Sequence, residues 1–239
     1  MNDSQINKIF AKTQQMELTY EPLIFRTIGE IPVVLMETKE HFRKTPEGDY
    51  RPIYKGEIWG GESCTGWFKG EIDGPAGKKL YLSAETGAIE TLLFAEDLPK
   101  GVFANKVVIH NRGNHHIQLL TDGLEEGQRL RFSLEAYCWH NVPGNQPFSV
   151  PETGDRKACF SGVFLCEMEE TVKDFVFDLR TLNQLAETLP DDFRRAEVEN
   201  CLVEVYRLVP QKPEEYPWES VLDNLQKARQ KMAPVLVAR

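Results

Sequence analysis

The spacing of the hydrophobic residues changes once along this chain of 239 residues, and that change constrains the fold more than any other feature. Between about Ile53 and Val172 apolar and polar residues tend to alternate, whereas after Thr171 apolar residues recur every three or four positions. Alternation is typical of strands with one buried face, and a period near 3.6 is typical of amphipathic helices. The sequence therefore predicts a β-rich region followed by a helical one.

Several short strands are predicted in the β-rich region. The clearest covers residues 129–137, where alternate positions form one apolar face: Leu130, Phe132, Leu134 and Ala136. Six further segments have strand-like patterns: 65–72, 79–84, 89–95, 106–110, 115–120 and 160–168. Turn residues separate them, among them those at 98–101 and 122–123. Such strands, with no helix between them, are typical of an antiparallel all-β sandwich of the jelly-roll or galactose-binding-like kind, with an Ig-like arrangement as the alternative.

Three helices are predicted after residue 172. The first has an apolar stripe that ends before Pro190, the second stops at Pro210, and the third opens at about Pro217. We expect Pro234 to end the third helix, because proline cannot donate the backbone hydrogen bond that a helix interior needs. The apolar residues that follow it then begin an extended segment.

These patterns divide the chain into four parts. Residues 1–50 are predicted to form a short amphipathic helix over the first 16 residues and an irregular, proline-broken lead-in. The sandwich covers 51–172, and a helical hairpin plus a third helix covers 173–233, which makes the fold α+β overall. Residues 234–239 are predicted to start a linker or strand to a further domain that is missing here. A polypeptide cut at a domain boundary has such an apolar end, and so does an ordinary tail packed on the body.

Composition argues against two classes of partner. The net charge is −9, and affinity for nucleic acid comes mainly from Lys and Arg that neutralise phosphates, so we expect no nucleic-acid partner. The apolar runs are too short to cross a bilayer and the polar N-terminus has no signal-peptide core, so we expect no membrane contact. Five scattered cysteines without CxxC spacing are typical of reduced thiols, which predicts a cytoplasmic location.

The sequence has no complete catalytic motif. HExxH, HxH, GxSxG and SxxK are all absent, and the glycine-rich residues 56–63 lack the lysine and hydroxyl of a phosphate-binding loop. Either His115 or His116, with His110 or His140, is a candidate pair of metal ligands, and Cys138 with His140 is a candidate thiol–imidazole pair. The alternatives are hydrogen-bonding histidines at a sheet end and a buried cysteine.

Aromatic residues gather in the predicted sandwich. Trp59, Trp67 and Trp139, together with His115 and His140, are candidates for contact with a carbohydrate or with another domain, because the faces of sugar rings stack on such side chains. The alternative is that the tryptophans fill the core, which is their commoner role.

Dispersed motifs resemble those of a known enzyme family. Residues 54–72 match a G-x-x-W-G … W-F-R stretch at Gly56, Trp59, Gly60, Trp67 and Phe68, with Lys69 in place of the arginine. Residues 80–103 and 110–144 match further strand and hairpin motifs, in the second segment at Asn114, His115, Glu135, Ala136, Tyr137, His140, Pro143 and Gly144. The chain from about 50 to 235 thereby resembles the N-terminal, non-catalytic region of family 38 glycoside hydrolases, the α-mannosidases of the cytosolic/vacuolar and bacterial type.

The resemblance implies a sandwich and a helical connector that precede a catalytic domain of the same polypeptide. That domain would bind zinc and carry an aspartate nucleophile. No position of this chain matches those residues, so we expect neither a catalytic residue nor a cofactor within it. The implied function is an accessory region of an enzyme that hydrolyses terminal α-mannosides, with a role in structure and in assembly into homo-oligomers, and without activity of its own.

Two other functions stay open at this point. One is a free-standing β-sandwich that binds a mannose-containing oligosaccharide through the region of Trp59, Trp67, Trp139 and His140. The other is a metal- or thiol-dependent enzyme built on Cys138, His140 and His115.

Overall fold

The chain folds as two compact units. The computed structural model describes residues 3–104, 116–138, 157–190 and 193–237. One unit, the helical unit, contains the chain up to Arg26 and from Met168 onward; the other, the sandwich unit, covers Thr27–Glu167. This division differs from the predicted one, because the N-terminal helix belongs with the C-terminal helices and not with a lead-in to the sandwich. Its apolar residues Met16 and Tyr20 are buried in the core of the helical unit.

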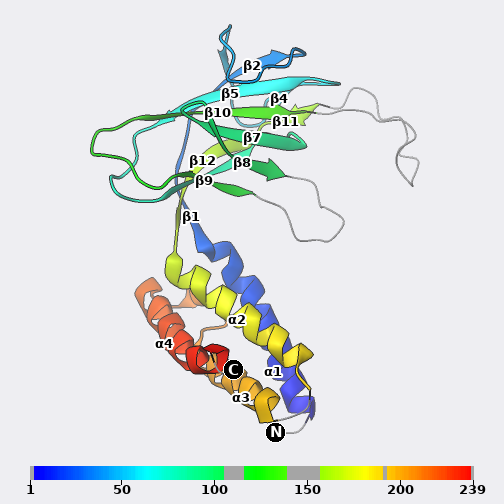
Figure 1. Ribbon diagram of the computed structural model, residues 1–239, viewed down its shortest axis with the longest axis vertical. Helices are drawn as coiled ribbons and strands as arrows, with labels where there is room; N and C mark the ends of the chain where they lie inside the picture. Colours follow the sequence, from blue (N-terminus) through cyan, green and yellow to red (C-terminus); the bar gives the residue numbers. More distant parts are fainter. Residues whose placement is uncertain (1–2, 105–115, 139–156, 191–192, 238–239) are drawn as a thin grey trace, which may run out of the picture. The chain divides into compact units, whose positions relative to one another are not determined.

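Antiparallel sheets form the sandwich unit (Figure 1). A four-stranded sheet has the order β1-β12-β6-β9, a six-stranded sheet has the order β3-β2-β5-β10-β7-β8, and β4 pairs with β11. The prediction of an antiparallel sandwich within an α+β chain is confirmed. The strands in the described part of the chain are β1 Phe25–Glu30, β2 Val34–Thr38, β3 Arg51–Pro52, β4 Ile58–Trp59, β5 Thr65–Ile72, β6 Leu80–Glu85, β7 Glu90–Ala95, β8 Leu98–Ala104, β9 Ile117–Thr121, β10 Leu130–Tyr137, β11 Ala158–Cys159 and β12 Gly162–Met168.

Strand β10 shows how alternation builds the core of the sandwich. Leu134 is fully buried, and it lies opposite Phe68 of β5 on one side and Leu93 of β7 on the other. The four-stranded sheet contributes Leu82 to the same cluster, so the core lies between the two sheets. Arg131, on the opposite face of β10, is exposed. Burial of each leucine of this kind stabilises the fold by roughly 1.5–3 kcal/mol.

The hairpin that joins β7 to β8 corrects one prediction. Residues 98–101 were expected to form a turn, but they belong to β8, and the turn consists of Glu96 and Asp97. Both residues have positive φ, 46° and 62°, as the two central residues of a type I′ turn do. Pro99 is tolerated in β8 because this strand lies at the edge of the sheet, where a missing N–H need not break the ladder.

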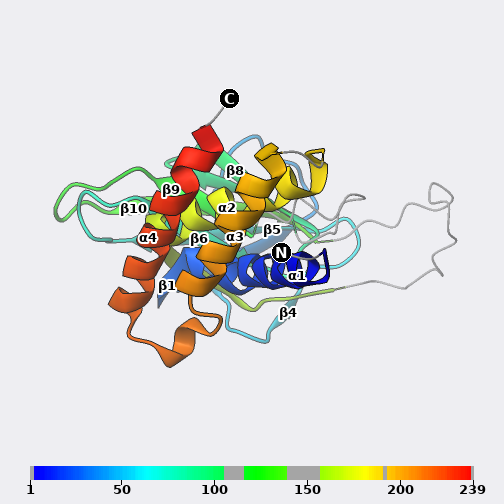
Figure 2. The same cartoon turned by 90° about the horizontal axis from the view of Figure 1, so that it is seen from below.

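Helices from both ends of the chain build the helical unit. In the described residues they are α1 Asp3–Tyr20, α2 Glu170–Thr188, α3 Phe193–Leu208 and α4 Trp218–Val237, with short 3₁₀ helices at Glu21–Ile24 and Pro213–Glu215. Helix α3 packs against both α1 and α4 (Figure 2). Between α1 and α2, Tyr20 meets Phe175 edge-on at a centroid distance of 5.5 Å. The apolar stripes read from the sequence thus face one shared core.

The predicted end of the last helix at Pro234 is wrong. Helix α4 continues through Pro234 to Val237. Val235 and Leu236 are partly buried against the helical core, and Arg194 of α3 donates a hydrogen bond to the carbonyl of Val235. These contacts offset the backbone hydrogen bond that Pro234 cannot donate. Residues 234–237 are therefore helix rather than a linker or a strand.

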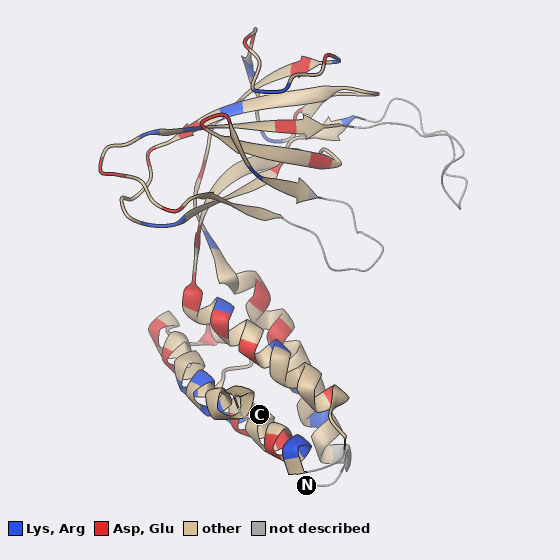
Figure 3. Cartoon of the chain, viewed as in Figure 1, with Lys and Arg blue, Asp and Glu red and all other residues tan. Residues whose placement is uncertain are grey.

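Charged side chains of both signs are interspersed over each unit (Figure 3). On α3, for example, Arg195 pairs with Glu199 at 2.9 Å, one helical turn away. None of the helices that the structure describes is long and apolar enough to cross a membrane.

Candidate functional site

Trp59 and Trp67, two of the predicted contact residues, are buried in the sandwich unit with exposed fractions of 2% and 0%. The Trp59 ring faces the core, where it meets Phe68 edge-on at 5.3 Å, and its Nε1 donates to the carbonyl of Thr86 at 2.7 Å. Trp67 is directed to the other face of β5 and packs obliquely on Phe94 at 5.8 Å. An enclosed ring presents no face to a sugar, so we assign neither tryptophan as a stacking platform.

The other predicted contact residues, His115, Trp139 and His140, lie outside the described residues. Their neighbour Cys138 is described, and it is buried beneath the glycine-rich segment. Within the described ranges, no three His, Cys, Asp or Glu side chains are grouped so as to hold a metal ion.

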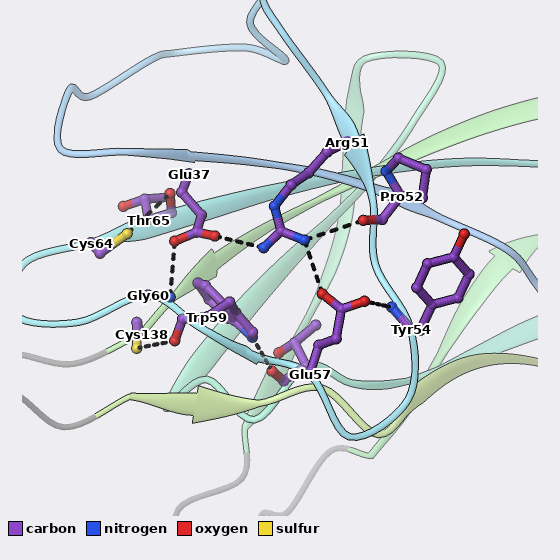
Figure 4. A network of polar contacts seen from close by, with 11 residues as sticks. Glu37, Arg51, Pro52, Tyr54, Glu57, Trp59, Gly60, Cys64, Thr65 and Cys138 are labelled. Carbon is purple, nitrogen blue, oxygen red and sulfur yellow. Dashed lines mark hydrogen bonds and ion pairs between the residues drawn. The ribbon is translucent and has the colours of Figure 1, made fainter.

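Arg51 of β3 joins two carboxylates where β2, β3 and β4 approach one another (Figure 4). Its Nη2 donates to Glu37 Oε1 at 3.0 Å and its Nη1 to Glu57 Oε2 at 3.1 Å. The second oxygen of each carboxylate accepts a backbone N–H, from Gly60 at 3.1 Å and from Tyr54 at 2.9 Å. The hydrogen bond with Glu37 is the main cause that raises the pKa of Arg51. All four carboxylate oxygens have partners, so this network fixes the chain between β3 and β5 rather than presenting an acid–base pair.

The glycine-rich segment packs closely against the end of β10. Gly60 has a φ of 75°, and a Cβ atom at this position would lie 2.5 Å from the Sγ of Cys138. The N–H of Cys138 donates to the carbonyl of Cys64 at 3.0 Å, which extends the pairing of β5 with β10. Burial, followed by the charge of Glu37, raises the pKa of the Cys64 thiol. Because a thiolate is the nucleophilic form, Cys64 is poorly suited to covalent catalysis.

A cavity of about 380 Å³ lies on the other face of the six-stranded sheet, opposite the core. Lys69 of β5 and Arg131 of β10 line it, together with Glu96 and Asp97 of the β7–β8 turn. These residues come from segments far apart in the chain, and the strand order alone brings them together.

Sequence reasoning missed both the Arg51 network and this cavity. Residues 20–50 have no regular hydrophobic period, and Glu37 meets Arg51 only because β2 and β3 are neighbours in the sheet. Gly60 and Gly61 both have positive φ, and adjacent glycines are the one local signal from which this backbone could have been predicted. No local pattern specified the partners of that backbone.

No protein-family model and no curated protein matches this chain. Among solved structures it is similar to three enzymes described as β-glucuronidases. The FMN-binding enzyme of Faecalibacterium prausnitzii L2-6 is 15% identical, with a TM-score of 0.37 over 59% of this chain and 22% of that one. The enzyme of Ruminococcus gnavus is 11% identical, with a TM-score of 0.37 over 62% and 29% of the two chains. A calcium-binding mutant of Bacteroides uniformis β-glucuronidase 2 is 14% identical, with a TM-score of 0.39 over 59% and 18%.

These neighbours are glycoside hydrolases by description, and none of the three is described as an α-mannosidase. The chain spans less than a third of the length of each. At such low identity and TM-score, the likeness does not bear on activity.

Proposed function

We propose that this chain is a non-catalytic accessory region of a glycoside hydrolase of the family 38 α-mannosidase type. In this proposal its two units support a zinc-dependent catalytic domain of the same polypeptide, which removes terminal α-mannosides, and they contribute to assembly into homo-oligomers. The proposed location is the cytoplasm. In support of it, all five cysteines lie in described ranges and none is in a disulfide.

The observation that carries the proposal is the position of the residues that resemble the family. Trp59, Trp67 and Phe68 are buried, and Gly60 is the glycine that packs closely against Cys138. A motif that builds the interior of a sandwich specifies a scaffold, whereas a binding motif would present these rings to solvent. The resemblance therefore supports a shared structural region rather than a shared sugar site.

The carboxylates of the described surface support a non-catalytic role. Glycosidases use two carboxyl groups that face each other across the scissile bond. In the sandwich unit, Glu37 and Glu57 share Arg51, while Glu71 pairs with Arg129 at 3.0 Å. Carboxylates that are each paired with a guanidinium in this way do not form the opposed acid and base that hydrolysis of a glycoside needs.

An activity assay tests the non-catalytic role. The purified chain should not hydrolyse an aryl α-mannoside, either with added zinc or after treatment with a chelator. A catalytically competent family 38 α-mannosidase, assayed alongside, shows that the conditions are adequate. Turnover that follows the chain through successive purification steps would contradict the proposal.

The encoding transcript provides a second, independent test. The proposal expects an open reading frame downstream of Arg239 that encodes a domain with a zinc-binding histidine–aspartate motif. A stop codon directly after Arg239, with no such domain in a partner chain, would remove the proposed role.

A further inference from the structure

The cavity on the outer face of the six-stranded sheet has the polar lining and the volume of a small-molecule site. Strands β5 and β10 are neighbours in this sheet (Figure 1) and provide Lys69, Arg131 and Ser133. The side chains of Lys69 and Arg131 are directed away from the core, because side chains alternate along a strand and Phe68 and Phe132 face inward. At about 380 Å³, the cavity is within the range of ~300–1,000 Å³ that small-molecule sites occupy.

Contacts between the surrounding segments hold this lining in place. The segment between β2 and β3 crosses the outer face, where Thr45 Oγ1 and Ser133 Oγ are 2.6 Å apart. From the same segment, the Tyr50 ring lies with its centroid 4.1 Å from the ammonium nitrogen of Lys69. A lining that is already ordered loses less conformational entropy when a ligand binds.

The β7–β8 turn is tied to the same lining. Glu96 Oε1 accepts the backbone N–H of Arg131 at 2.9 Å, and its Oε2 accepts from Arg131 Nη2 at 3.3 Å. This two-point contact keeps the turn beside β10. Asp97, the other turn residue, also lines the cavity.

The chemistry of the lining selects the class of ligand. Four carboxylates line it, Glu47, Glu71, Glu96 and Asp97, against two basic side chains. Arg129, which pairs with Glu71, adds a third basic group beside the lining, so one negative charge is in excess and disfavours an anion. An apolar ligand would displace water from these charged groups without offering them hydrogen bonds. A hydroxyl group both donates and accepts, so it can bind a carboxylate and a basic side chain at once.

We propose that this cavity binds a neutral, hydroxyl-rich ligand, a saccharide, through hydrogen bonds to Lys69, Arg131 and the surrounding carboxylates. The site involves neither Trp59 nor Trp67. It does not depend on the accessory role proposed above, because a non-catalytic region and a free-standing module could both contain it.

A titration of the full chain followed by amide-resonance NMR tests the site. The probes are methyl α-mannoside, methyl β-glucoside and sodium glucuronate, the last being an anionic sugar of similar size. A saturable shift of the resonances around Lys69, Arg131 and Ser133 is expected with at least one neutral sugar, and a weaker effect with glucuronate. Absence of a saturable shift with every probe, shifts confined to other parts of the chain, or stronger binding of glucuronate would overturn the proposal.

Variants locate the binding and test its charge selectivity. Arg131→Ala should weaken binding of the neutral sugar about tenfold or more, because a hydrogen bond to a charged donor is lost. Asp97→Asn keeps a residue that tolerates positive φ and removes one negative charge from the lining. It should therefore lower the ratio of the affinity for the neutral sugar to the affinity for glucuronate. Lys78→Ala is the control, an exposed lysine that pairs with Glu167 away from the cavity and should leave binding unchanged.

Each variant is first checked for native circular dichroism and an unchanged unfolding midpoint. Equal binding by wild type and Arg131→Ala, or an Asp97→Asn variant with an unchanged ratio of affinities, would overturn the proposed contacts. The α-mannosidase assay does not depend on these variants, so failure of this site and failure of the accessory role give different results.

Discussion

Trp59 and Trp67 show how far a residue's surroundings decide its role. Both are buried tryptophans of the sandwich unit, Trp59 in β4 and Trp67 in β5, but within the described residues only the indole N–H of Trp59 has a hydrogen-bond partner, the carbonyl of Thr86. The Nε1 of Trp67 is buried with no partner among the described residues. From the sequence alone both were candidates for sugar contact, because the spacing of an aromatic residue does not show whether its ring will be covered.

This difference predicts unequal costs for the same substitution. Trp59→Phe removes the hydrogen bond and leaves the buried carbonyl of Thr86 unpaired, whereas Trp67→Phe removes an N–H that has no partner. The loss of volume is similar, so Trp59→Phe should lower the free energy of unfolding by about 1–2 kcal/mol more than Trp67→Phe. Urea unfolding of the two variants, followed by near-UV circular dichroism, measures the difference. Equal losses would contradict the argument.

At the scale of elements, prediction succeeded where the pattern was long and failed where packing overrode it. The apolar alternation at 129–137 and the helical stripe after Thr171 correspond to β10 and α2, because each presents one continuous face to a core. The turn predicted at 98–101 is instead part of strand β8, because the chain reverses two residues earlier, where Glu96 and Asp97 adopt positive φ beside Arg131. Pro and Gly in the sequence indicate that a turn is near, but tertiary contacts decide which residues form it.

Helix α4 provides a test at the same scale. Pro234 leaves one backbone carbonyl of the preceding turn without its helical donor, and interior proline costs about 3 kcal/mol relative to alanine. Since Pro234 lies near the helix end, Pro234→Ala should stabilise the helical unit by a smaller amount, about 1 kcal/mol. Denaturation followed by far-UV circular dichroism measures it, with Lys227→Ala at an exposed position of α4 as the control. No gain, or a loss, would indicate that residues 234–237 are not helical in solution.

At the scale of the whole molecule, the sequence predicted the change from strands to helices but not the division into units. The stripe of the N-terminal helix was visible, but nothing local indicated that its partners lie far along the chain. Thr13, for example, donates a hydrogen bond at 2.8 Å to Asn183, 170 residues away. The same reason explains the Arg51 network and the outer-face cavity. Both depend on strand order, which hydrophobic period does not encode.

Buried ionisable groups in both units predict how stability changes with pH. In the helical unit, burial, followed by the charge of Glu204, raises the pKa of Cys201 from 9.0 to about 11. In the sandwich unit, burial, followed by the charge of Glu47, raises the pKa of Tyr50 from 10.0 to about 12. The unfolded chain therefore loses these protons first, and each loss favours unfolding.

The stabilising contribution of the two groups is fully present below about pH 9 and is lost as the pH rises through about 11 and 12. We therefore expect the urea concentration at the unfolding midpoint of each unit to fall across this alkaline range. Hydrogen exchange of the segments of each unit measures its midpoint separately. Cys201→Ala should flatten the decline in the helical unit and leave that of the sandwich unit unchanged. A midpoint that stays constant or rises above pH 9 would show that neither group is shielded from solvent as the structure places it.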